Sequence, residues 1–126
     1  MKIEHIAIWV NDLEMMRSFY EKYLEGTSGP RYHNPSKNFT SYFISFDDGC
    51  RVELMHRPDI PAGDKSESLG ITHLAFSLGS REQVDVLTER FRGDQYTIAG
   101  EPRTTGDGYY ESVVLDPEGN RLELTE

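Results

Sequence analysis

The sequence predicts an α+β fold in which two tandem βαβββ units form a curled, cup-shaped mixed sheet that helices cover on its outer face. The first observation is an internal repeat: residues 3–10 and 71–78 read IEHIAIWV and ITHLAFSL, and residues 49–54 and 119–124 read GCRVEL and GNRLEL. Self-similarity of this kind is typical of duplicated structural units. The second and third observations are alternating polarity within these segments and a helix-start signal after each opening segment.

The opening strand of each copy has an apolar face and a mixed face, because successive side chains of a strand point to opposite sides. The apolar faces are formed by Ile6, Ile8 and Val10 in the first copy and by Leu74, Phe76 and Leu78 in the second. The mixed faces carry His5, Ala7 and Trp9, and His73, Ala75 and Ser77. We therefore expect each histidine to lie on the face away from the helices.

A helix follows each opening strand. Asn11 with Glu14, and Ser80 with Gln83, have the spacing of a capping box, which marks a helix start. Apolar residues at helical spacing then predict one buried stripe per helix, before Gly26 and before Gly93. The two stripes are Leu13, Met16, Tyr20, Tyr23 and Leu24, and Val84, Leu87 and Phe91.

Each copy closes with a predicted hairpin, residues 42–46 and 109–115 being followed by turns at 47–49 and 116–120. In the closing strands Glu53 and Glu123 alternate with apolar residues, so both glutamates are expected on the same face as the histidines. Shorter strands are expected at 30–33 and 96–98. The whole chain, 1–126, is predicted to be one domain, with repeats at about 1–57 and 71–126 and a Pro- and Gly-containing linker at about 58–70.

Composition excludes some classes of partner. The formal net charge of −9 argues against nucleic acid, which requires a basic surface. No stretch approaches the roughly 18 apolar residues needed to cross a membrane, and the start of the chain has no apolar signal-peptide core. The single Cys50 cannot form an internal disulfide. We therefore expect a cytoplasmic protein with a small-molecule substrate, no nucleic acid and no membrane association.

The repeat places a histidine and a glutamate in register in both halves. Glu53 follows His5 by 48 positions, and Glu123 follows His73 by 50. Taken singly, each is expected to be a hydrogen-bonded or solvated residue. Two matched pairs related by an approximate two-fold axis predict a shared site for one divalent ion, with Ni, Zn, Co, Mn and Fe all compatible with such ligands. An ion with open positions can hold two vicinal substrate oxygens while Glu53 or Glu123 transfers a proton.

The paired halves, the opening strands IEHIAIWV and ITHLAF, the ending LDPEGNRLEL and the order His, Glu, His, Glu resemble the vicinal oxygen chelate superfamily, which includes glyoxalase I. The resemblance covers essentially the whole chain and implies His5, Glu53, His73 and Glu123 as metal ligands. In glyoxalase-like relatives the carboxylate of the last strand can leave the metal, which favours Glu123 as the base and Glu53 mainly as a ligand.

The second ligand position separates branches of this superfamily. Methylmalonyl-CoA epimerases typically carry Gln there, fosfomycin-resistance transferases and extradiol dioxygenases use three ligands, and bleomycin-binding members lack the metal residues. Glu53 therefore favours a glyoxalase-like lyase or isomerase over a thiol transferase or a metal-free binding protein. Small glyoxalase I enzymes usually grip glutathione with Arg and Asn where this chain has Trp9 and Arg57. The resemblance thus implies a different thiol or none, and a homodimer whose site lies within one chain or is shared between chains.

Overall fold

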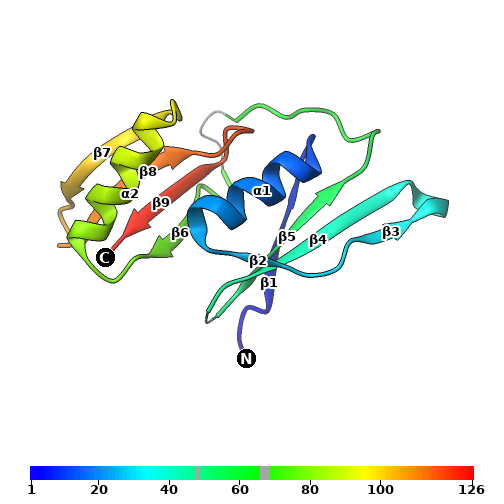
Figure 1. Ribbon diagram of the computed structural model, residues 1–126, viewed down its shortest axis with the longest axis horizontal. Coiled ribbons are helices and arrows are strands. Elements are labelled where there is room, and N and C mark those ends of the chain that lie inside the picture. The colour runs from blue at the N-terminus through cyan, green and yellow to red at the C-terminus, as the bar shows by residue number, and fades with distance from the viewer. Residues whose placement is uncertain (48, 66–68) are drawn as a thin grey trace. The chain divides into compact units, whose positions relative to one another are not determined.

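The computed structural model describes residues 1–47, 49–65 and 69–126 (Figure 1). They form two compact units, Met1–Asp64 and Lys65–Glu126. Each unit combines a mixed β-sheet with an α-helix, which confirms the predicted α+β class and its paired βαβββ pattern. Position 48 of the first predicted turn and positions 66–68 of the predicted linker lie outside the described residues.

The first unit contains β1 (His5–Trp9), α1 (Leu13–Leu24), β2 (Thr27–Ser28), β3 (Tyr32–Asn34), the 3₁₀ turn η1 (Pro35–Lys37), β4 (Phe39–Ser45) and β5 (Arg51–His56). β1 is parallel to β5, β5 is antiparallel to β4, and both β2 and β3 pair with β4. The single strand expected at 30–33 is thus two short strands. Pro30 lies between them and cannot donate a hydrogen bond to β4.

The second unit contains β6 (Leu74–Ser77), α2 (Arg81–Gly93), β7 (Ile98–Thr104), β8 (Tyr110–Leu115) and β9 (Arg121–Thr125). β6 is parallel to β9, and β9, β8 and β7 follow in antiparallel order. β7 is longer than the strand expected at 96–98 and begins two residues later. Its pairing with β8 is shifted twice, near Gly100 and before Arg103, and these irregularities interrupt the alternation from which its length could be predicted.

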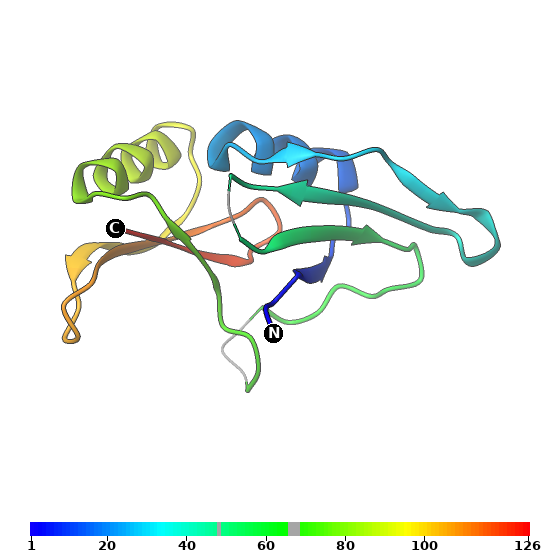
Figure 2. The same cartoon turned by 90° about the horizontal axis from the view of Figure 1, so that it is seen from below.

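Each helix covers the apolar face of its own sheet, as the two views of the chain show (Figures 1 and 2). The predicted stripe of α1 is buried, and in α2 Val84 and Phe91 are fully buried whereas Leu87 is half-buried. Val52, Leu54, Leu122 and Leu124 of the closing strands are buried beneath the helices. Glu53 and Glu123 therefore lie on the opposite faces. Within the described residues, neither helix has the length and apolar character that crossing a bilayer requires.

The helix starts agree with the sequence only in part. Ser80 caps α2 as predicted, its hydroxyl accepting from the Gln83 amide at 3.3 Å. The prediction of Asn11 as the cap of α1 is wrong: Asp12 is the cap, and its carboxylate accepts from the Met15 amide at 2.9 Å. Asx residues occupy both positions, and the backbone at Asp12 is extended, so the helix begins one residue later.

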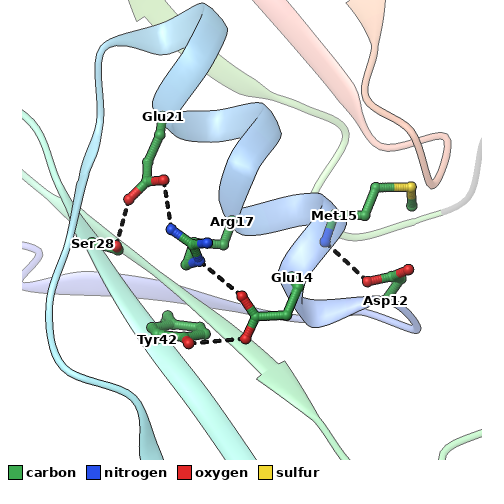
Figure 3. Close-up of polar contacts among 7 residues, drawn as sticks. All are labelled: Asp12, Glu14, Met15, Arg17, Glu21, Ser28 and Tyr42. Carbon is green, nitrogen blue, oxygen red and sulfur yellow. Dashed lines mark hydrogen bonds and ion pairs between the residues drawn. The ribbon is translucent and has the colours of Figure 1, made fainter.

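Polar contacts tie α1 to its sheet along one side (Figure 3). Arg17 lies between two acidic residues of the same helix and donates to Glu14 at 3.0 Å and to Glu21 at 2.7 Å. Glu14 accepts from the Tyr42 hydroxyl of β4 at 2.9 Å, and Glu21 accepts from the Ser28 hydroxyl of β2 at 2.5 Å. These contacts join α1 to β2 and β4.

Candidate metal-binding site

Strand register places the predicted ligands in the same way in both units. Ala7 of β1 is opposite Glu53 of β5, and Ala75 of β6 is opposite Glu123 of β9. Each histidine precedes its alanine by two residues and therefore shares its face. Since alanine ends at a methyl group, it leaves room for the imidazole and the carboxylate to approach each other above it.

The two residues of the first pair lie close to each other. His5 Nε2 lies 3.9 Å from Glu53 Oε2, and the Glu53 side chain is more deeply buried than that of His5, with exposures of 14% and 38%. Phe43 of β4 is directly opposite Glu53, and its ring meets the His5 imidazole edge to face at a centroid distance of 5.2 Å. The aromatic contact holds the imidazole over the sheet.

Glu4 supports this pair, although the sequence analysis did not single it out. Its carboxylate contacts His5 Nδ1 on one side and the Arg51 guanidinium on the other, and these contacts lower the pKa of Glu4. A carboxylate on the second ring nitrogen is the usual support of a metal-binding histidine. Glu4 precedes β1, so strand alternation could not have predicted where its side chain points.

The second pair is closer. His73, which immediately precedes β6, has its Nε2 atom 3.3 Å from Glu123 Oε2, with side-chain exposures of 39% and 18%. Burial raises the pKa of Glu123, His73 opposes the shift, and the charge of Glu111 together with a hydrogen bond to it adds to the rise. Glu111 lies on β8 and accepts from Arg103 of β7 at 3.1 Å. Glu111 precedes Val113 by two residues, and Val113 is directly opposite Glu123, so the three side chains share a face.

The donor atoms of each pair suit a common divalent ion. Two ligands at about 2.0–2.2 Å from one ion are about 2.8–3.6 Å apart at octahedral or tetrahedral angles. The 3.3 Å of the second pair lies within this range, and the 3.9 Å of the first lies slightly beyond it, within reach of a small rotation of the half-exposed His5. Among the described residues no three His, Cys, Asp or Glu side chains gather closely enough to hold a metal; each unit presents a pair.

The remaining histidines serve local structure. His33 Nδ1 is 3.1 Å from the Thr40 hydroxyl, and His56 Nδ1 is 3.0 Å from the backbone carbonyl of Val10. Both lie in the first unit, and these contacts link neighbouring segments of its sheet. Neither histidine has a counterpart in the other repeat, which agrees with these local roles.

Known proteins resemble this chain over nearly its full length. The family model described as Glyoxalase/Bleomycin resistance protein/Dioxygenase superfamily matches residues 2–124. Two relatives from Bacillus subtilis (strain 168), the uncharacterized proteins YqjT and YwkD, are each 27% identical to the chain. The first match covers 97% of this chain and 96% of YqjT, and the second covers 98% of this chain and 95% of YwkD.

Solved structures share the fold. Glyoxalase I from Zea mays is 22% identical with a TM-score of 0.81 over 98% of this chain, which spans only 44% of the maize chain. The trypanothione-dependent glyoxalase I of Leishmania major is 21% identical with a TM-score of 0.81, over 100% of this chain and 86% of its own. A glyoxalase family protein from Enterococcus faecalis is 24% identical with a TM-score of 0.80, over 99% of this chain and 97% of its own.

The similarity to these structures bears on the fold, whereas the match to the family model bears on descent. That match includes both histidines and both glutamates of the two pairs, together with the strands that carry them. The chain belongs to the Glyoxalase/Bleomycin resistance protein/Dioxygenase superfamily.

Proposed function

We propose that the protein is a metal-dependent, glyoxalase-like lyase or isomerase that acts on a small molecule with two vicinal oxygens. The observation that carries the proposal is the duplicated pair: His5 with Glu53, and His73 with Glu123, at donor separations of 3.9 and 3.3 Å. Membership of the superfamily supports the reaction type. The Zea mays and Leishmania major neighbours, which are glyoxalase I enzymes, support the same choice.

His5, Glu53, His73 and Glu123 would together hold one divalent ion. When bound, such an ion polarises the substrate oxygens and lowers the cost of removing a proton from the neighbouring carbon. Glu4 would keep the His5 imidazole in one tautomer, with Nε2 directed to the ligand side. Phe43 would support the same imidazole through its edge-to-face contact.

We assign the proton transfer to Glu123 and the role of a ligand to Glu53. The two glutamates are equivalent in the repeat, but their neighbours differ. Glu53 lies opposite the apolar Phe43, whereas Glu123 has a second carboxylate, Glu111, beside it on β8. Carboxylate Oε2 of Glu123, the atom that faces His73, would take the proton from the substrate carbon and return it to the adjacent carbon.

Metal titration of the apoprotein tests the ligand set. Calorimetry with Ni, Co, Mn and Zn should give one ion per site, and His5→Ala or His73→Ala should weaken binding strongly. His33→Ala is the matched control, since His33 bonds to Thr40 away from either pair, and it should bind metal as the parent does. Unchanged affinity in His73→Ala would refute the ligand set. No metal binding by the parent would refute the proposal and favour a metal-free binding protein.

Turnover of a panel of 2-oxoaldehyde adducts, with and without thiols, tests the reaction. Glu123→Gln should retain measurable metal affinity while losing about 10²- to 10⁴-fold in rate, the usual effect of removing a general base. It should also slow exchange of the substrate proton with solvent. An undiminished rate in this variant contradicts the base assignment. Opening of an epoxide such as fosfomycin by a thiol, with no turnover of the 2-oxoaldehyde adducts, favours a transferase.

A further inference from the structure

Three aromatic side chains of the first unit form a continuous row. The Trp9 ring meets the Phe39 ring edge to face at 6.0 Å, and Phe39 meets Tyr32 at 6.0 Å with tilted planes. These residues come from β1, β4 and β3, so strand pairing assembles the row from distant parts of the chain. Trp9 is 40% exposed and Tyr32 is 53% exposed, although their rings are large.

This row lies on the face that carries the first His–Glu pair. Trp9 is opposite Met55, and Met55 is opposite Ser41, which is in turn opposite Tyr32. Directly paired residues share a face, and Glu53 precedes Met55 by two residues on β5. The row therefore begins at the level of Met55, about 7 Å along β5 from Glu53. This distance is about the length of a small ring system.

A fixed positive charge borders the row. The Arg57 guanidinium carbon lies 5.6 Å from the centre of the Trp9 ring, and Arg57 Nε donates to Asp59 at 2.5 Å. The guanidinium thus contacts an aromatic ring on one side and a carboxylate on the other. An arginine held in this way is suited to planar, negatively charged groups, because its remaining N–H groups form a rigid fork.

We propose that Trp9, Phe39, Tyr32 and Arg57 form a subsite for a planar aromatic ring that carries its own anionic group, such as the ring of a carboxyphenyl-substituted 2-hydroxy or 2-oxo acid. This inference rests on the proposed function, in that the vicinal oxygens would face the His5–Glu53 pair while the ring stacks on the row. Exposed aromatic faces bind planar rings better than saturated ones, because stacking adds to the burial of apolar area. Arg57, which follows Met55 by two residues and contacts Trp9, selects for negative charge on the ring.

Trp9 is the chain's single tryptophan, so its fluorescence reports on this subsite alone. Mandelate, which carries a phenyl ring and two vicinal oxygens, should change the fluorescence and bind about two- to tenfold more tightly than hexahydromandelate, its saturated analogue. Lactate, with a methyl group in place of the ring, should bind more weakly still. Equal affinity for mandelate and hexahydromandelate, or no response to mandelate, would overturn the inference.

Variants measured by calorimetry provide the second arm. Trp9→Leu retains an apolar side chain on the edge strand and should abolish the preference for mandelate over hexahydromandelate. Arg57→Gln should weaken binding of 4-carboxymandelate, whose ring carries a second carboxylate, but not of mandelate. Tyr109→Leu is the matched control, because Tyr109 is an exposed aromatic residue of the second unit, 59% exposed, and it should leave every affinity unchanged.

The titrations are repeated with and without a divalent ion, which separates this inference from the proposed function. Metal binding without a preference for the aromatic ligand overturns the subsite and leaves the proposed function standing. A preference for mandelate in a protein that binds no metal supports the subsite and refutes the proposed function. A change of oligomeric state in Trp9→Leu, together with no preference in the parent, assigns the row to contact between copies of the chain and overturns the subsite.

Discussion

Glu4 affects the candidate site without being one of the proposed ligands. Because its carboxylate contacts His5 Nδ1 and is itself held by Arg51, it can fix both the tautomer and the orientation of the imidazole. We expect Glu4→Gln to weaken metal binding by about 10- to 100-fold, the usual effect of removing such a support. Calorimetric titration measures this directly.

Glu101→Gln is the control for this prediction, since Glu101 is a glutamate of β7 that pairs with Arg92 far along the chain from His5. It should bind metal as the parent does. A Glu4→Gln variant with parental affinity would mean that Glu4 only pairs with Arg51 and does not orient the ligand.

Asp116 is a buried carboxylate that holds the turn before β9. Oδ1 accepts from the amides of Glu118 and Asn120, and Oδ2 accepts from the Asn120 side chain, yet burial outweighs these bonds and raises the pKa of Asp116. The folded state therefore holds the proton more tightly than the unfolded state does. Stability from this group is complete below its ordinary pKa of about 3.9 and is lost as pH rises through the folded-state pKa.

Comparison with Asp116→Asn isolates this titration, because asparagine does not ionise. Urea unfolding at several pH values between about 3 and 7 gives the free energy of unfolding of both proteins. The value for the parent minus the value for the variant should fall as pH rises. A difference that increases with pH would mean that the hydrogen bonds, and not burial, dominate the pKa of Asp116.

At the scale of elements, the close packing of α1 against β4 depends on one glycine. A Cβ atom at Gly26 would overlap Cγ2 of Ile44, which is fully buried, and would lie 3.2 Å from the Phe46 ring. Gly26→Ala should therefore lower the free energy of unfolding by about 1–3 kcal/mol, the usual cost of overpacking. Denaturant unfolding measures the change.

Gly93→Ala is the matched substitution in the second unit. Gly93 ends α2, and a Cβ atom there meets nothing within 4 Å. Alanine loses less backbone entropy than glycine in a helix, so this variant should be more stable by about 0.5–1 kcal/mol. Destabilisation of Gly93→Ala as large as that of Gly26→Ala would show that the clash with Ile44 is not the cause of the first effect.

For the whole molecule we predict a homodimer, since closed two-fold pairs are the most frequent assembly of soluble oligomers. Light scattering at micromolar concentration should give twice the mass of the 14.4 kDa chain, and a monomer would contradict the prediction. Mixed His5→Ala and His73→Ala chains test where the ligands combine. Restored activity places one pair from each chain in a shared site, whereas no recovery in a verified heterodimer places both pairs in one chain.

The local geometry of the chain made much of this structure predictable. Period-two alternation placed His5, Glu53, His73 and Glu123 on the faces away from the helices, because a strand turns alternate residues to opposite sides whatever it pairs with. The boundary between the two compact units, at Asp64 and Lys65, falls within the linker expected between the repeats. Local signals were less decisive where two neighbours offered the same chemistry, as at Asn11 and Asp12, or where bulges broke the alternation, as in β7.

Other features depend on register between strands far apart in the sequence, which alternation does not specify. Pairing of β1 with β5 decided that Glu53 faces Ala7 and so approaches His5, and pairing through β4 brought Trp9, Phe39 and Tyr32 into one row. Glu4, which contacts His5, precedes β1 and lies outside any strand. The sequence by itself determined which side chains share a face; the tertiary structure decided which of them meet, because only packing of the helix and sheet selects one register among those that the pattern allows.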